Sequence, residues 1–171
     1  DQTGFPWFVI CELPSDNSNT GSELADGSVA RLNTVNNFTY NAGVDELNNW
    51  WTGNYNAIAS CNVALESLQK LSNEELKIRC MAQARFFRGF FYFNLVKAFG
   101  GVPLMLDVPQ PGGYNTPRAT EEEVYVEIVN DLTYAAENLP TRAQWGEKEV
   151  GRVTKGTARG LLAKVYLFMQ N

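Results

Sequence analysis

Histidine is absent from this chain of 171 residues, and cysteine occurs only three times. Without histidine, the chain lacks the commonest general base, the commonest metal ligand and the usual catalytic triads. No Cys-x-x-Cys pair is present either, so neither a zinc site nor a thioredoxin-type redox motif is indicated. The sequence therefore predicts no catalytic residue, no metal site and no cofactor.

The three cysteines, Cys11, Cys61 and Cys80, are an odd number, which argues against a disulfide scaffold. We expect them to be buried thiols, because free cysteine is among the residue types most often found in protein interiors. A bond between Cys61 and Cys80 across a helical hairpin is left open.

Basic residues are also few, since 14 Lys and Arg face 19 Asp and Glu and the net charge is −5. The chain has no basic run of the kind that binds nucleic acid, so no nucleic-acid partner is predicted. It also lacks an apolar run long enough to span a bilayer as a helix. A neutral, sugar-like ligand is compatible with this charge, but the charge does not select it.

Aromatic residues are abundant, and residues 86–93 alone contain five phenylalanines and one tyrosine. Such a run indicates a buried helix, a ligand platform or a membrane segment. Its aromatic residues occupy more than one helical face, which is typical of a helix packed between other elements. Arg88, Asn94 and Lys97 interrupt the wider apolar stretch, so we favour a core helix.

Apolar residues at three- and four-residue spacing predict four helices, over residues 45–71, 73–99, 120–139 and 154–171. Candidate N-caps mark the start of three of them, namely Ser72 with Glu75, Thr120 with Glu123, and Thr154. Gly100 follows the second helix, where a C-terminal glycine cap is expected.

The first 44 residues are rich in Asn, Ser, Thr, Asp and Gly, which predicts a mostly irregular region with room for one short helix. A loop this long is uncommon in a compact domain unless it is functional. We therefore divide the chain into an irregular N-terminal region, residues 1–44, and a helical region, residues 45–171. The second region ends within a helical pattern, so we expect it to be a truncated part of a larger single-domain protein.

Two short patterns recur along the helical region. Ala84, Arg85 and Tyr92 return as Ala158, Arg159 and Tyr166 at an offset of 74, and Tyr55 and Ile58 return as Tyr125 and Ile128 at an offset of 70. Two similar hairpins in series are typical of tetratricopeptide (TPR)-like repeats. The predicted fold class is all-α, with two TPR-like helical hairpins (an α-α superhelix) and long irregular loops. Arg85 and Arg159 are expected to bond loop carbonyls or acids between the repeats.

Four blocks of the sequence resemble a known family in their residues, order and spacing. They are "WWTGNYNAIASCNVALE", "ARFFRGFFYFNLVKAFGGVPL", "RATEEEVYVEIVNDLTYAAENLP" and "GRVTKGTARGLLAKVYLF". Over residues 45–171 the chain is similar to the SusD/RagB family of outer-membrane nutrient-binding lipoproteins.

This resemblance implies a longer protein that is lipid-anchored on the outward face of the outer membrane. It implies binding of an oligosaccharide, or in some members a peptide or other nutrient, without chemistry on that ligand. The implied partner is a SusC-like TonB-dependent transporter, and the only membrane contact is the lipid anchor. The family's anchor cysteine and signal sequence are not found in this chain, so we expect it to be a fragment.

The resemblance also suggests a ligand site in "NNWWTGN", where the first long helix begins. Family members with glycan sites place a tryptophan and an asparagine near this point, which correspond here to Trp51 and Asn54. Flat aromatic rings stack on the apolar faces of sugars, and amides hydrogen-bond to their hydroxyls. We predict Trp50, Trp51 and Asn54 as ligand-binding residues, and packing of either tryptophan onto the hairpin is the alternative.

Other aromatic residues and other functions stay open at this point. Trp7, Trp145 and Tyr114 are expected in loops, where they could line a cleft but more often pack.

The alternative functions are a TPR-type scaffold for protein partners and a peptide-binding import component. A glycan-degrading enzyme is disfavoured, because no pair of isolated acids suits glycosidase chemistry.

Overall fold

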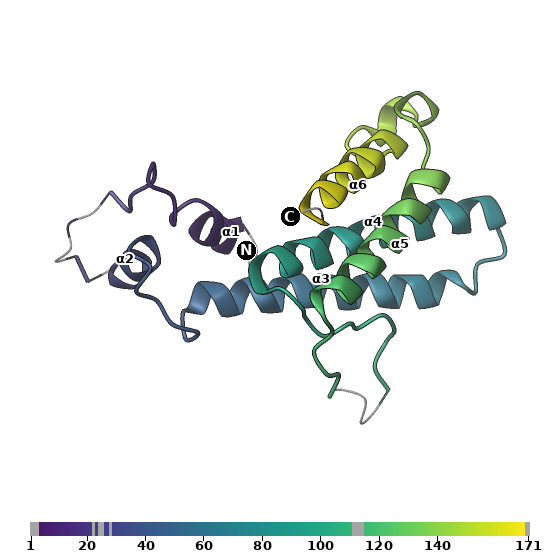
Figure 1. Cartoon of the computed structure of the whole chain (residues 1–171). Helices are drawn as coiled ribbons and strands as arrows, with labels where there is room; N and C mark the ends of the chain where they lie inside the picture. The colour runs from purple at the N-terminus through teal and green to yellow at the C-terminus, as the bar shows by residue number, and fades with distance from the viewer. Residues whose placement is uncertain (1–3, 22, 24–25, 28, 111–114, 170–171) are drawn as a thin grey trace. The chain divides into compact units, whose positions relative to one another are not determined.

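The computed structural model describes residues 4–21, 23, 26–27, 29–110 and 115–169, and these residues form helices and loops without a β-strand (Figure 1). The α-helices are α1 (Gly4–Cys11), α2 (Ala30–Asn36), α3 (Asp45–Leu68), α4 (Glu74–Phe99), α5 (Glu121–Asn138) and α6 (Lys155–Met169). Two 3-10 helices, Arg142–Gln144 and Glu147–Glu149, lie between α5 and α6. The predicted all-α class is confirmed. None of the described helices is both long enough and apolar enough to cross a membrane.

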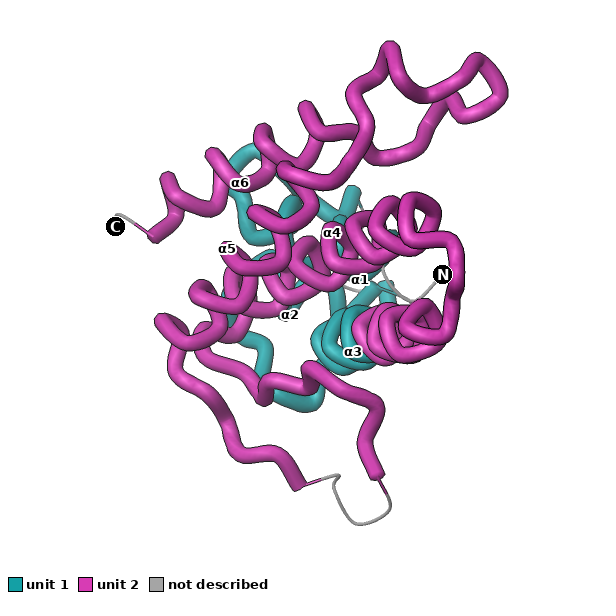
Figure 2. The backbone as a smooth tube through the Cα atoms, turned by 90° about the vertical axis from the view of Figure 1, so that its right-hand side faces the viewer, with its two compact units in different colours: residues 1–55 teal, residues 56–171 magenta. Residues whose placement is uncertain are grey.

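The chain divides into two compact units, residues 1–55 and residues 56–171 (Figure 2). The division falls within α3. The expected boundary after residue 44, between an irregular and a helical region, stays a prediction. The N-terminal region also holds two short helices, α1 and α2, where at most one was expected. These helices form because they bury apolar side chains against each other, which the polar composition around them obscures.

The first unit has a small apolar core of its own. Val9, Leu13 and Val35 are buried in one cluster, and Leu32 and Val44 pack against it. Around this core, the Asn36 amide donates to the carbonyls of Leu13 (2.7 Å) and Ser18 (3.0 Å), which ties the segment after α1 to α2. Arg31 on α2 and Glu46 on α3 form an ion pair at 2.7 Å. Side chains of α2 therefore hold both the irregular segment before it and the start of α3.

In the second unit, α4, α5 and α6 pack in chain order with alternating directions, as Figures 1 and 2 show. Gly89 lets α4 and α5 approach closely, since a Cβ there would lie 3.2 Å from Leu132 Cγ. The expectation that the aromatic residues of α4 are core holds for Phe86, Tyr92 and Phe93, which are buried. It is wrong for a second group along the helix. Phe87 and Phe90 are exposed, and each contacts the half-buried Phe91. Phe87 lies three residues before Phe90 and four before Phe91, so it shares a side of the helix with both.

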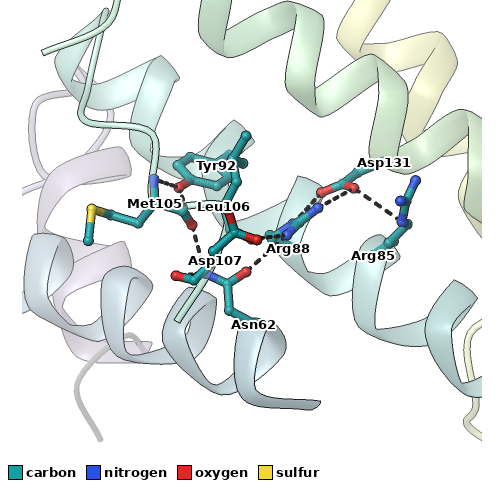
Figure 3. Close-up of polar contacts among 8 residues, drawn as sticks. All are labelled: Asn62, Arg85, Arg88, Tyr92, Met105, Leu106, Asp107 and Asp131. Atoms are coloured by element: carbon teal, nitrogen blue, oxygen red, sulfur yellow. Dashed lines mark hydrogen bonds and ion pairs between the residues drawn. The ribbon is translucent and has the colours of Figure 1, made fainter. Parts of the chain in front are cut away.

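Arg88 joins α4 to its neighbours through a buried network, drawn in Figure 3. Its Nε and Nη2 donate to the two carboxylate oxygens of Asp131 on α5, at 2.7 and 2.9 Å. Its Nη1 donates to Asn62 Oδ1 on α3 (2.9 Å) and to the carbonyl of Leu106 (2.8 Å). One guanidinium therefore connects three helices and the extended segment that follows α4.

Two further side chains hold the same extended segment. The Tyr92 hydroxyl donates to the carbonyl of Met105 (3.0 Å) and accepts from its N–H (2.6 Å). The Asn62 amide donates to the carbonyls of Met105 (2.7 Å) and Asp107 (3.3 Å). The consecutive carbonyls of residues 105–107 thus accept hydrogen bonds from side chains. These bonds replace the ones that an extended segment usually forms with a partner strand.

The sequence predicted that Arg85 and Arg159 bond loop carbonyls or acids between the repeats, and for Arg85 this is confirmed, because its Nε pairs with Asp131 Oδ1 on α5 at 3.9 Å. This contact is longer than those of Arg88, and the Arg85 guanidinium also lies over the Tyr134 ring, 4.3 Å from the centroid. Arg159 is exposed on α6. Arg88 lies three residues after Arg85, nearly one turn further along the helix, and points between the helices instead.

The helix caps agree with the sequence in three positions out of four. Thr120 and Glu123 form the capping box of α5, and Thr154 accepts from the N–H of Thr157 at the start of α6. Gly100 ends α4 with φ +67°. The fourth prediction is wrong, because Asn73 and not Ser72 caps α4; the Asn73 side chain accepts from the N–H of Leu76 at 3.0 Å. Asparagine is as good an N-cap as serine, so composition did not separate the two.

The long connection between α4 and α5 is closed at its base. Arg118 donates to the carbonyls of Phe99 and Gly101, both at 2.5 Å, and the Ala119 N–H donates to the carbonyl of Val102 at 3.2 Å. Gly101 is required by this closure, since a Cβ there would lie 2.2 Å from the carbonyl oxygen of Ala119. The "GGVP" motif therefore caps a helix and allows the two ends of the connection to meet.

All three cysteines lie among the described residues, and none of them forms a disulfide bond there. Cys61 is buried, Cys80 is half-buried and Cys11 is exposed, so the expectation of three buried thiols fails for Cys11. No bond joins Cys61 to Cys80. Burial raises the pKa of the Cys61 thiol to about 11 and the pKa of Tyr92 to about 12.

We predict that Arg88→Met lowers the free energy of unfolding by about 3–5 kcal/mol, because it leaves the Asp131 carboxylate buried without its partner. Combining it with Asp131→Leu should recover much of this loss, since an apolar pair has no charge to desolvate. Urea unfolding measures both, with the exposed Arg159→Met as the control. A loss for Arg88→Met no larger than that of the control would contradict the role given to the network.

We also predict that the protein loses stability as the pH rises from about 9 to about 12. Cys61 and Tyr92 both have a raised pKa in the folded state, above their ordinary values of 9.0 and 10.0. The contribution of each group is therefore complete below its ordinary pKa and is lost as the pH passes its folded pKa. The loss is about 1.4 kcal/mol for each pH unit that separates the two pKa values.

Urea unfolding at pH 8 and pH 11 should show this fall in stability. Cys61→Ala should reduce the difference between the two pH values, because it removes one of the two groups. Cys11→Ala, at an exposed thiol, is the control and should leave the difference unchanged. Equal effects of the two substitutions would refute the assignment.

Candidate functional site

The three residues that the sequence predicts as ligand-binding lie in the first half of α3, within the first unit, and differ in exposure. Trp50 is only 4% exposed and Asn54 is fully buried, whereas Trp51 is half-buried. Neighbouring residues of an α-helix point about 100° apart, so adjacent tryptophans face different surroundings. In this structure Trp51 is the one of the three whose side chain is open to a ligand.

Trp51 does not stand alone, since its ring packs against Tyr55 one turn later. The two ring centroids are 4.9 Å apart and the planes are tilted by 46°. Tyr55 is also half-buried, so the pair presents two aromatic edges from one rigid helix. In the sequence Tyr55 belongs to the helical period and was not predicted as a candidate site residue, although its four-residue spacing from Trp51 is a usable signal.

Asn54 is turned inward along α3. Its amide nitrogen donates to the carbonyl of Trp50 at 2.7 Å, four residues earlier in the helix. This bond stabilises the helix at the point where the tryptophans lie, which is a positioning role. A direct bond from Asn54 to a ligand would require this part of α3 to move.

Two buried polar atoms near the start of α3 have no hydrogen-bond partner among the described residues. They are Trp50 Nε1 and Glu46 Oε2, while the other carboxylate oxygen of Glu46 is paired with Arg31. Buried polar atoms without a partner cost about 1–3 kcal/mol each. The start of α3 therefore contains buried polar atoms whose hydrogen bonds are not satisfied. This feature is common near functional sites.

The second unit holds a separate hollow of about 590 Å³ between the end of α3, α4 and the segment after α4. Its size is within the range of small-molecule sites. Its wall mixes polar and apolar side chains, among them Glu66, Gln69, Met81, Arg85, Leu106 and Gln110. Acids and amides balance the arginines here, so the hollow suits an uncharged polar ligand better than a phosphate. The sequence gives no sign of it, because its wall combines segments far apart in the chain.

The sequence also named Trp145, Trp7 and Tyr114 as aromatic residues that could line a cleft. Trp145 is buried, its Nε1 donates to the carbonyl of Val153 (3.1 Å), and Arg79 and Arg152 lie over its ring. Packing, the favoured alternative, is therefore confirmed for Trp145. Trp7 is in α1 instead of a loop and is 45% exposed. Tyr114 lies outside the described residues.

Stability measurements should separate the two tryptophans. Trp50→Ala is expected to lower the free energy of unfolding by about 3–5 kcal/mol, since it removes a large buried ring. Trp51→Ala should lower it by about 1 kcal/mol or less, because much of that ring is already in contact with water. Thermal unfolding of both variants tests this. Equal losses would mean that Trp51 is a core residue and would remove it as a ligand surface.

Known proteins similar to this chain share its fold. A SusD-like family model, described as starch-binding and associating with the outer membrane, matches residues 12–167. SusD-like protein P2 of Formosa agariphila is 34% identical over 154 residues, which cover 85% of this chain and 29% of that protein. The chain spans between 22% and 29% of the length of the curated relatives it matches.

Solved structures show the same arrangement. A SusD-like protein from Bacteroides fragilis superposes with a TM-score of 0.85 and 32% identity, over 98% of this chain and 32% of its own. A laminarin-binding SusD-like protein superposes with a TM-score of 0.78 and 33% identity, over 87% of this chain and 32% of its own. The resemblance stated from the sequence is thus confirmed, and the chain belongs to the SusD-like family.

Proposed function

We propose that this chain is part of a glycan-binding protein at the outer-membrane surface, which holds an oligosaccharide for import and performs no chemistry on it. The observation that carries the proposal is the Trp51–Tyr55 pair, two half-buried rings held on one helix. Aromatic rings fixed in this way offer an apolar face to a sugar at little entropic cost.

Family membership supports the choice of ligand. The matching family is described as starch-binding, and one of the similar structures is a laminarin-binding protein. The excess of acidic residues and the mixed polar wall of the hollow are both suited to an uncharged ligand. The hollow of the second unit is by itself a candidate site for a peptide, which keeps a peptide-binding import component as the second candidate function.

In this proposal Trp51 contacts the sugar ring directly. Trp50 and Asn54 lie beneath it, and their contact with ligand requires a shift of α3 that opens the buried side. The proposal also includes a lipid anchor on the full-length protein and a SusC-like TonB-dependent transporter as the partner that receives the ligand. The family's description as associating with the outer membrane supports the location.

Affinity-gel electrophoresis of the full-length protein against a panel that includes starch and laminarin tests the proposal. We expect one polysaccharide to retard the protein, and Trp51→Ala to weaken binding about tenfold, the equivalent of about 1.4 kcal/mol of lost stacking. Trp7→Ala, at an exposed tryptophan of α1, is the matched control and should bind normally.

Absence of retardation by every glycan would refute glycan binding. Co-purification with a TonB-dependent transporter would then favour peptide or other nutrient import, and its absence would favour a TPR-type scaffold for protein partners.

A further inference from the structure

Helix α2 ends in a Schellman motif with an unusual residue at its key position. The N–H of Phe38 donates to the carbonyl of Val35 (3.2 Å), and the N–H of Thr39 donates to the carbonyl of Thr34 (2.9 Å). These two bonds define the motif. The residue that follows the C-cap of the helix, position C′, adopts the left-handed conformation in it. That residue is Phe38, with φ +56°.

Phenylalanine is a poor choice for this conformation. The left-handed region brings Cβ against the backbone, so the position is normally filled by glycine, and a bulky residue there is strained. At the end of α4, by comparison, the residue with a positive φ is a glycine, Gly100, with φ +67°. Among the residues that the structure describes, Phe38 is the only non-glycine residue with a positive φ.

Burial does not explain why phenylalanine is present. The side chain of Phe38 is 65% exposed, so its ring recovers little of the hydrophobic stabilisation that would offset the strain. A strained residue that packing does not require is a reason to look for a function. Each of residues 37–43 is exposed, so the whole segment is a surface feature of the first unit.

The segment is nevertheless held in a defined shape. Besides the Schellman bonds, Asn41 Oδ1 accepts from the N–H of Gly43 (2.8 Å), and the Val44 N–H donates to the carbonyl of Asn41 (3.3 Å). Tyr40 borders a small cavity beside the apolar core of the first unit and is still 43% exposed. Its ring therefore rests on the core and presents the remainder outward.

We propose that Phe38 and Tyr40 form an aromatic platform that contacts a pyranose ring of the glycan, in addition to Trp51. The proposal rests on the glycan-binding function proposed above. The occupant is inferred from the order of side chains in "NFTYN", where two exposed rings alternate with amides and a hydroxyl. Rings suit the apolar faces of a sugar, and Asn37, Thr39 and Asn41 can hydrogen-bond to its edges.

The position of the platform in the first unit suits this role. The segment leads directly into α3, and Trp51 lies only about 9 Å along the helix axis from the first residue, Asp45. Both aromatic groups thus belong to the same compact unit, at the end where α3 begins.

The test uses the full-length protein with laminarin and starch as probes, and measures both affinity and thermal stability. Phe38→Gly is expected to raise the unfolding midpoint by about 2 °C, because it relieves the left-handed strain, and to weaken binding about fivefold. Phe38→Asn, which tolerates the same backbone conformation, should weaken binding equally, and Phe38→Trp should retain it. Phe8→Ala removes another exposed ring of the same unit, on α1, and should leave affinity unchanged.

The outcomes separate the platform from the proposed function. Unchanged affinity of Phe38→Gly and Phe38→Asn, with binding weakened by Trp51→Ala, would overturn the platform and leave glycan binding intact. Binding by neither probe in the wild-type protein would overturn both. A lowered unfolding midpoint for Phe38→Gly would show that the ring packs against another part of the full-length protein, and would also overturn the platform.

Discussion

The second unit depends on the buried pair between Arg88 and Asp131. Its two parallel hydrogen bonds satisfy both oxygens of the carboxylate, and the remaining donors of the guanidinium reach α3 and the backbone after α4. A buried ion pair stabilises a protein only when such additional bonds offset the loss of water. Here those bonds also fix the order of packing, since one side chain of α4 must find partners on two other helices and one extended segment. The network thus selects a single arrangement of elements that apolar contacts alone would leave less defined.

Much of the fold follows from local features of the sequence. The capping box at Thr120, the glycine at the end of α4 and the helical periods each depend on residues a few positions apart, and the structure confirms them. The network does not follow from local features, because 43 positions separate Arg88 from Asp131. Within its own helix Arg88 only interrupts an apolar run. The internal repeat directed attention to Arg85 and Arg159, since it records similarity between hairpins and not the contacts between them.

The candidate site, too, could be predicted from the sequence only in part. The sequence identified the aromatic start of α3, but the adjacent Trp50 and Trp51 could not be told apart, because exposure depends on which face of the helix is covered. Composition predicted irregular backbone before residue 45 and concealed the two helices that shape it. The strain at Phe38 is invisible to any propensity scale, since phenylalanine at that position predicts nothing about φ. Functional residues of this kind contradict local preferences, and they emerge only when backbone angles and exposure are considered together.

The closed base of the connection between α4 and α5 has a consequence for how such proteins diversify. Arg118 and the Ala119–Val102 bond fasten the two ends of this segment to each other. Apart from residues 105–107, which Arg88, Tyr92 and Asn62 hold, the helices therefore do not depend on what lies between those ends. Doubling the length of a loop closed in this way costs only about 0.6 kcal/mol. Insertions and deletions at this point should therefore accumulate during evolution without unfolding the helices. Relatives that meet different nutrients could then remodel the rim of the neighbouring hollow while inheriting the same framework.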